Sequence, residues 1–174
     1  MKINNKDKNI VLIGFMGSGK TSVGKRLSLV LKREFIDTDD FIEKREGMTI
    51  NEIFKEKGEE EFRKIERELY KRFSTPKKKI IATSGGVIKN PANIANLKKG
   101  GVIVYLKSSP EKIAQNLKFD NTRPILQVDD KEAKIRELLA QREPFYNKYA
   151  EITIDVSNYD IDHTVDKIIE LAKV

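Results

Sequence analysis

Residues 14–21 read Gly14-Phe15-Met16-Gly17-Ser18-Gly19-Lys20-Thr21 and directly follow the apolar run at residues 9–13. They fit the pattern G-x-x-x-x-G-K-[ST], whose glycines let the backbone approach an anion closely. Backbone N–H groups and the positive end of the following helix then form an anion-binding seat. In this pattern the lysine reaches the β- and γ-phosphates and the next hydroxyl binds Mg²⁺. The stretch therefore predicts a nucleoside-triphosphate site, and a glycine-rich turn without a ligand is the less favoured alternative.

Apolar runs alternate with helical patterns along the rest of the chain. The runs span residues 9–13, 34–37, 79–83, 101–106 and 151–156. Helices are expected over 20–32, over 50–73 with a break near Gly58, and from about residues 110 and 161 onward. In the first helix the spacing predicts a buried face of Val23, Leu27, Val30 and Leu31. The alternation predicts one α/β domain, 1–174, with a five-stranded parallel sheet between two helical layers.

Composition narrows the possible functions. The 174 residues include 34 Lys and Arg against 27 Asp and Glu, and the resulting charge of +7 favours anionic partners such as nucleotides, carboxylates or nucleic acid. The absence of cysteine excludes disulfides and thiolate chemistry, and a single histidine, His163, argues against a histidine metal site or a Ser-His-Asp triad. No segment approaches the roughly 18 apolar residues that span a bilayer. We expect a cytoplasmic protein that does not associate with membranes.

Two aspartates follow the second apolar run. Asp37 and Asp39 are two residues apart, so they share a face if the strand stays extended. One carboxylate would then hold a water on Mg²⁺ while the other accepts a proton from an attacking hydroxyl. A solvated strand end, or a helix cap formed by Asp39 or Asp40, is the alternative interpretation.

Two helical arginines are candidates for binding an anion. Arg63 lies three residues before Glu66 and flanks an apolar stripe, so the pair is either an inward arginine with a supporting glutamate or a surface ion pair. Arg142 continues the apolar face of its own helix, and Phe145 and Tyr146 are expected to extend that face. An arginine there either extends to solvent or meets a buried anion.

A third arginine, Arg123, lies in a polar stretch at residues 118–130 that lacks helical or strand periodicity. Loops of this length in a compact domain are often functional or disordered. Arg123 would either neutralise charge on the transferred phosphoryl group or belong to a mobile, solvated loop.

Together these motifs resemble the shikimate kinase family of nucleoside-monophosphate-kinase-like P-loop enzymes, over about residues 9–172. In order, they are Gly17-Ser18-Gly19-Lys20-Thr21, Phe35-Ile36-Asp37-Thr38-Asp39, Gly58 with Phe62-Arg63 and Glu66, Ser84-Gly85-Gly86, Arg123-Pro124-Ile125-Leu126, and Arg142-Glu143-Pro144-Phe145-Tyr146. In this family the motif at 84–86 usually consists of three glycines. Ser84 replaces the first, where its side chain either narrows the substrate pocket or adds a hydrogen bond.

The resemblance implies transfer of the γ-phosphoryl group of ATP to the 3-hydroxyl of shikimate, with Mg²⁺ as cofactor, in aromatic amino acid biosynthesis. It implies a monomer with a substrate-binding helical segment at about 38–75 and a lid at about 117–130. Asp39 would be the catalytic base, assisted by Lys20 and Arg123. The implied contacts are Gly17, Ser18, Gly19, Lys20, Thr21, Ser22 and Arg123 for ATP; Asp39, Arg63, Gly85, Gly86 and Arg142 for shikimate; and Thr21 and, through water, Asp37 for the metal.

Two other functions stay open at this point. One is a related kinase that acts on another hydroxy acid, such as gluconate, or on a nucleotide. The other is a basic P-loop ATPase that binds RNA or DNA. The basic runs Lys77-Lys78-Lys79 and Lys98-Lys99 have no clustered aromatic residues beside them, which disfavours nucleic-acid binding.

Overall fold

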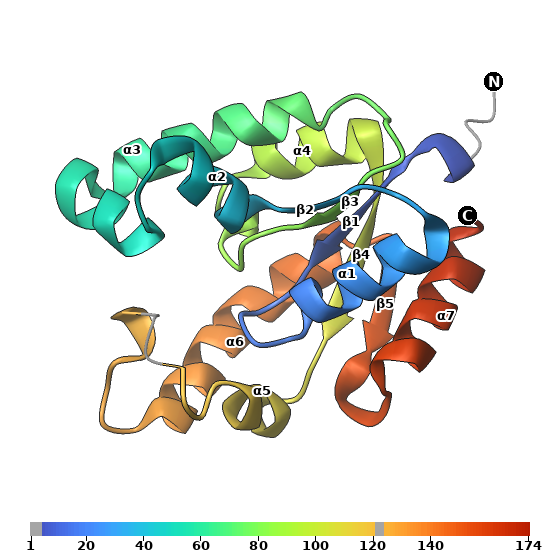
Figure 1. Cartoon of the computed structure of the whole chain (residues 1–174). Coiled ribbons are helices and arrows are strands. Elements are labelled where there is room, and N and C mark those ends of the chain that lie inside the picture. Colours follow the sequence, from blue (N-terminus) through green and yellow to red (C-terminus); the bar gives the residue numbers. More distant parts are fainter. Residues whose placement is uncertain (1–4, 121–123) are drawn as a thin grey trace.

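The computed structural model describes residues 5–120 and 124–174, in which a parallel sheet lies between two layers of helices (Figure 1). The strands are β1 (Asn9–Ile13), β2 (Phe35–Asp37), β3 (Ile80–Ala82), β4 (Gly101–Lys107) and β5 (Ile152–Asp155). They form one five-stranded sheet in the order β2-β3-β1-β4-β5, and every pair is parallel. The predicted α/β class and the five-stranded parallel sheet are confirmed.

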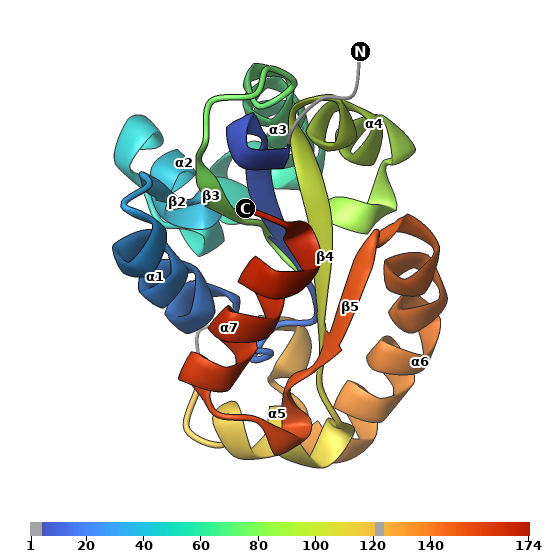
Figure 2. The same cartoon turned by 90° about the vertical axis from the view of Figure 1, so that its right-hand side faces the viewer.

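Helices cover both faces of the sheet (Figure 2). Helices α1 (Lys20–Leu31) and α7 (Ile161–Ala172) lie against one face, where their apolar residues pack on Ile10 and Leu12 of β1. The opposite face, with Val11 and Ile13, packs against three helices, α3 (Ile50–Arg72), α4 (Pro91–Gly100) and α6 (Lys131–Tyr149). The remaining elements are α2 (Thr38–Glu46), α5 (Pro110–Asn116) and the short 3-10 helices η1 (Asn5–Asp7), η2 (Val87–Lys89), η3 (Pro124–Leu126) and η4 (Val156–Asn158).

The expected break at Gly58 is present in α3, where this residue has φ 85° and ψ 163°. Two predicted core positions are wrong, because Val30 and Phe145 are each 47 % exposed. Successive helical residues are 100° apart, and each of these side chains falls at the edge of its buried face. In α1 that face is turned toward Gly24, which packs closely against the ring of Phe35. In α6 it is centred near Leu139 and Tyr146, both of which are buried.

Asn9 is a polar residue inside the core, and its amide joins β1 to the turn that follows α3. Its Nδ2 donates to the carbonyl oxygens of Phe73 (3.4 Å) and Thr75 (3.2 Å). Its Oδ1 accepts from the backbone N–H groups of Lys77 and Lys79, each at 3.0 Å. All these partners are backbone groups, so a single side chain satisfies much of this turn and fixes it to the central strand.

The register brings three segments to one edge of the sheet. Ala82 of β3 pairs with Leu12 of β1 on one side and with Asp37 of β2 on the other. The glycine-rich stretch after β1, the aspartates after β2 and the loop at 84–86 after β3 therefore lie together at the carboxyl ends of the strands. Open α/β sheets bind their ligands at this edge. Among the described residues, no helix is both long enough and apolar enough to cross a membrane.

Candidate active site

The glycine-rich stretch between β1 and α1 forms a turn whose backbone requires glycine. Gly17 and Gly19 have φ values of 76° and 92°, a region that side-chain-bearing residues rarely adopt. The Lys20 ammonium donates to the carbonyl oxygens of Gly14 (2.6 Å) and Phe15 (3.0 Å). The lysine thus lies over the loop that is expected to hold phosphate. Ser18 is buried within the loop, and Ser22 is exposed in the first turn of α1.

Thr21 and Asp37, the two predicted metal residues, lie side by side. The Thr21 Oγ1 donates to Asp37 Oδ2 at 2.8 Å. The other carboxylate oxygen of Asp37 accepts from the N–H groups of Asp39 (3.0 Å) and Asp40 (3.2 Å) and so caps α2. The expected extended strand end is therefore wrong, and so is a cap formed by Asp39 or Asp40. Asp39 instead lies in the first turn of α2, because the Asp37 carboxylate binds the free amides of that turn.

A hydroxyl beside a carboxylate is an oxygen set that suits Mg²⁺, which is usually held by one or two protein groups together with substrate phosphates. Within residues 5–120 and 124–174, no cluster of three or more His, Cys, Asp or Glu side chains is arranged to hold a metal ion. The Thr21 hydroxyl and the Asp37 carboxylate fit a cation that arrives with a nucleotide.

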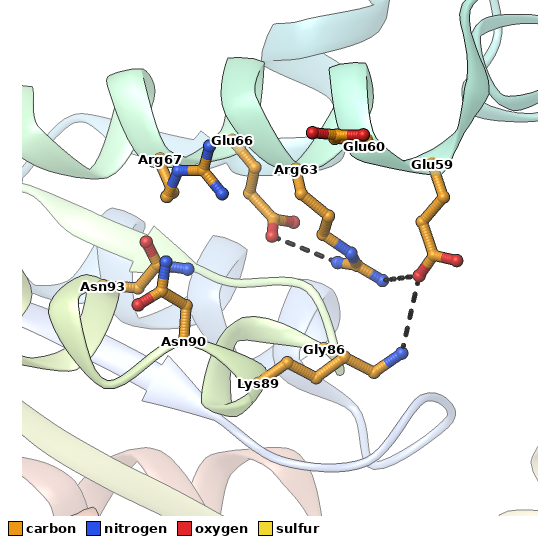
Figure 3. Close-up of a pocket in the computed structure, with 9 residues that line it drawn as sticks. All are labelled: Glu59, Glu60, Arg63, Glu66, Arg67, Gly86, Lys89, Asn90 and Asn93. Atoms are coloured by element: carbon orange, nitrogen blue, oxygen red, sulfur yellow. Dashed lines mark hydrogen bonds and ion pairs between the residues drawn. The ribbon is translucent and has the colours of Figure 1, made fainter.

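Arg63 is supported by a buried glutamate. Its Nη1 lies 3.1 Å from Glu66 Oε1, and the Glu66 side chain is only 1 % exposed (Figure 3). Its Nη2 lies 3.5 Å from the exposed Glu59, and the guanidinium is 5.2 Å from the ring centroid of Phe62. The surface-pair interpretation fails, since one partner is inside the protein. A buried carboxylate is a strong, fixed partner for a guanidinium.

Arg142 of α6 approaches the loop at 84–86, and Arg63 of α3 approaches the same loop. The Arg142 guanidinium lies 5.5 Å from the ring centroid of Phe15. A Cβ added to Gly85 would be 3.3 Å from Arg142 Nη1, and one added to Gly86 would be 2.9 Å from Arg63 Nη1. Arg142 of α6 and Arg63 of α3 thus converge on two adjacent glycines, which leave room for both.

Tyr146 holds the loop at 84–86 in place, and no sequence signal indicated this role. Its hydroxyl donates to the carbonyl oxygen of Gly85 at 2.7 Å, and its ring stacks on Tyr105 at 5.0 Å between centroids. Burial raises the pKa of Tyr146 to about 12, so the donor stays protonated at physiological pH. The apolar spacing of α6 predicted burial for Tyr146, but no local signal pointed to its hydroxyl partner.

A cavity of about 440 Å³ opens beside Arg63, Glu66 and Gly86, and Lys89 also lines it (Figure 3). Burial, followed by the charges of Arg63 and Arg142, lowers the pKa of Lys89. This lysine is 3.8 Å from Glu59. No sequence motif pointed to Lys89, whose position follows from the short 3-10 helix after Gly86. Arg67 is a third cationic side chain in the lining, and Glu59, Glu60 and Glu66 are three acidic ones, so the cavity carries charges of both signs.

Arg123, predicted as a phosphate contact, lies outside the described residues, and so does its neighbour Thr122. The chain just before it contacts the glycine-rich stretch. Asn116 Nδ2 donates to the carbonyl oxygen of Gly17 at 2.8 Å, and a Cβ on Gly17 would lie 2.7 Å from the Leu117 side chain. The first residues of the expected lid, at 117, thus adjoin the predicted ATP site.

Known proteins of one family match this chain over nearly its whole length. The family model described as shikimate kinase matches residues 16–173. A shikimate kinase from Caldanaerobacter subterraneus subsp. tengcongensis is 51% identical over 162 residues, 93% of this chain and 94% of that protein. The structure of a shikimate kinase from Acinetobacter baumannii in complex with shikimate is 39% identical, with a TM-score of 0.90 over 98% of this chain and 95% of its own. The structure of a shikimate kinase from Aquifex aeolicus is 34% identical, with a TM-score of 0.81 over 95% of this chain and 96% of its own.

Proposed function

The chain belongs to the shikimate kinase family, and we propose that it transfers the γ-phosphoryl group of ATP to the 3-hydroxyl of shikimate in aromatic amino acid biosynthesis. Membership makes it an ATP-dependent phosphotransferase. The observation that carries the assignment of roles is the convergence of Arg63 and Arg142 on Gly85 and Gly86, at the sheet edge shared with the glycine-rich loop.

The carboxylate of shikimate binds between Arg63 and Arg142. Each planar guanidinium presents paired donors that match a carboxylate. This proposal is supported by the fixed position of both arginines, one on buried Glu66 and the other over Phe15. Gly85 and Gly86 contribute backbone close to the bound acid.

The triphosphate of ATP binds along residues 17–22, with Lys20 exchanging its contacts to Gly14 and Phe15 for phosphate oxygens. Thr21 would hold Mg²⁺ directly and Asp37 would hold it through water, in keeping with the 2.8 Å contact between them. When bound, Mg²⁺ neutralises charge on the phosphate oxygens and orients them. The Thr21 hydroxyl and the Asp37 carboxylate would supply the protein oxygens for this ion.

Asp39 orients the 3-hydroxyl and accepts its proton as the new O–P bond forms and the bond to the ADP oxygen breaks. A loose phosphoryl-transfer transition state needs little basicity, so Asp39 does not require a raised pKa for this role. Arg123, on a lid at about 117–130, neutralises charge on the transferred group. Closure of this lid over the helical segment at 38–75 excludes water, which otherwise accepts the phosphoryl group.

We further propose that residues 1–174 form one domain that works as a cytoplasmic monomer and binds no nucleic acid. Family membership disfavours the alternatives of a gluconate kinase, a nucleotide kinase or a nucleic-acid-dependent ATPase.

The test is ADP release by the purified protein with ATP, Mg²⁺ and a panel of acceptors: shikimate, gluconate, a nucleoside monophosphate and single-stranded RNA. We expect shikimate alone to stimulate release well above the water background, and we expect EDTA to abolish it. An Asp39→Asn preparation made in parallel controls for contaminating kinases. Preferential turnover of another acceptor, or stimulation by RNA, would refute the proposal.

A further inference from the structure

Glu66 carries a charge in the interior of the protein and uses both of its oxygens. Oε1 faces Arg63 Nη1 at 3.1 Å. Oε2 accepts a hydrogen bond from the Ser84 hydroxyl at 2.8 Å. The glutamate side chain is only 1 % exposed, so protein groups rather than bulk water supply these contacts. Of the two donors, Arg63 belongs to the proposed substrate site, while Ser84 has so far no role.

The hydrogen bonds around Ser84 run in one direction. A carboxylate only accepts, so the single hydroxyl proton of Ser84 points to Glu66. The Tyr70 hydroxyl lies 3.5 Å from the Ser84 oxygen and is therefore the donor in that long contact. Burial, and next the charge of Glu66, raise the pKa of Tyr70 well above its usual value, which keeps this donor protonated. Tyr70, Ser84 and Glu66 thus form a buried series that ends at Arg63.

Ser84 stands where this family usually has glycine, and its backbone does not require glycine, because its φ is not positive. In the structure the Ser84 hydroxyl donates to Glu66, a contact that glycine cannot make. Without the hydroxyl, one oxygen of a buried carboxylate loses its donor, a change that costs more than an ordinary hydrogen bond. Glu66 then gains freedom to rotate. The Arg63 guanidinium, which lines the open cavity, then loses the fixed orientation of its buried partner and can shift within that cavity.

We propose that Ser84 is a positioning residue for the substrate carboxylate: its hydroxyl holds Glu66 in the one orientation that keeps Arg63 aimed at the acid. Ser84 does not touch the substrate in this account. The inference rests on the proposed function, because it assigns Arg63 to the carboxylate of shikimate. A glycine at position 84 has no hydroxyl and so cannot hold Glu66 against Arg63 in this way.

The test compares Ser84→Ala with wild type in steady-state kinetics and in shikimate binding by calorimetry. We expect the KM and Kd for shikimate to rise about five- to tenfold, the KM for ATP to stay within twofold, and kcat to fall less than the KM rises. Ser74→Ala is the matched control. The Ser74 hydroxyl donates to the backbone carbonyl of Lys71 at the end of α3, the helix that carries Glu66, and it lies away from the cavity. Ser84→Thr, which keeps the hydroxyl, is expected to recover most of the affinity.

A second comparison uses Glu66→Gln as background. If Ser84 acts through Glu66, adding Ser84→Ala to that variant raises the KM for shikimate much less than it does in wild type. Equal effects in both backgrounds would overturn the inference. So would a lowered melting temperature with an unchanged shikimate KM, which describes a merely structural serine. A wild-type protein that fails to phosphorylate shikimate would instead refute the proposed function, and that assay is completed before the Ser84 variants are tested.

Discussion

Replacing Gly86 by alanine is expected to weaken substrate binding without weakening the fold. Gly86 has φ −88° and ψ 7°, which alanine adopts without strain. The loss of freedom in the unfolded chain alone stabilises such a variant by about 0.4–1 kcal/mol. The new Cβ, however, would lie 2.9 Å from Arg63 Nη1 and 3.2 Å from Nη2, whereas ordinary contact begins at 3.4 Å. The guanidinium must therefore retreat by about half an ångström.

That displacement acts on the atoms proposed to bind the carboxylate. Charge-assisted hydrogen bonds are worth about 1.5–3 kcal/mol each, so losing the geometry of one raises the shikimate Kd about 10- to 100-fold. The measurements are shikimate Kd by calorimetry, KM for both substrates and the melting temperature. ATP affinity should not change.

Gly47→Ala is the informative control for this experiment, because it should lower the stability of the fold and leave shikimate binding unchanged. Gly47 has φ 66° and open space around it, so alanine there meets no atom but is strained by about 1 kcal/mol. We expect its melting temperature to fall by about 2–4 °C and its kinetics to stay as in wild type. If Gly86→Ala keeps wild-type shikimate affinity, the convergence of Arg63 on this loop is not what binds the acid. If it unfolds more easily than Gly47→Ala, the expectation that alanine adopts the Gly86 backbone without strain is wrong.

Three further outcomes follow from the same geometry. Asp39→Asn should lower kcat at least about 100-fold while ATP still binds, and near-wild-type turnover would remove Asp39 from the mechanism. Arg142→Lys should weaken shikimate binding by about 1–3 kcal/mol through loss of the planar fork, and an unchanged KM would show that Arg142 does not grip the acid. The pKa of Tyr146 is about 12 in the folded protein against about 10 unfolded. Its contribution is therefore complete below pH 10 and is lost as the pH rises toward 12. Thermal denaturation of Tyr146→Phe across this range should show a smaller decline than wild type, and parallel curves would contradict the assignment.

Local spacing predicts the framework of this protein because each element carries its own signal. The strand at residues 9–13 is observed with those bounds, and the strand at 79–83 is shorter by one residue at each end. The break at Gly58 is visible in the sequence since no other residue adopts its backbone angles cheaply. The error at Asp39 arose because a helix directly follows β2. The capping carboxylate is Asp37, two positions before Asp39 and three before Asp40.

The site is predictable as a set of residues but not as a set of contacts. The motifs named Arg63, Arg142 and the two glycines, and the structure brings these residues together, while their role in binding stays a prediction. The hydroxyl that holds Glu66 comes from a residue 18 positions away, and the one that holds the Gly85 carbonyl comes from a residue 61 positions away. No periodicity within one element encodes such pairs, since they exist only once the helices pack on the sheet.

The amide of Asn9 gives the longest helix of the protein one anchored end. Because this side chain binds backbone groups at Phe73 and Thr75, the carboxyl-terminal end of α3 is tied to the central strand. Any swing of this part of α3 is then smallest near residue 73 and grows along the helix toward the break at Gly58, as in a lever with its pivot at Asn9. Arg63 lies partway along this arm, so a tilt of the helix moves its guanidinium across the mouth of the cleft by a fraction of what the far tip travels.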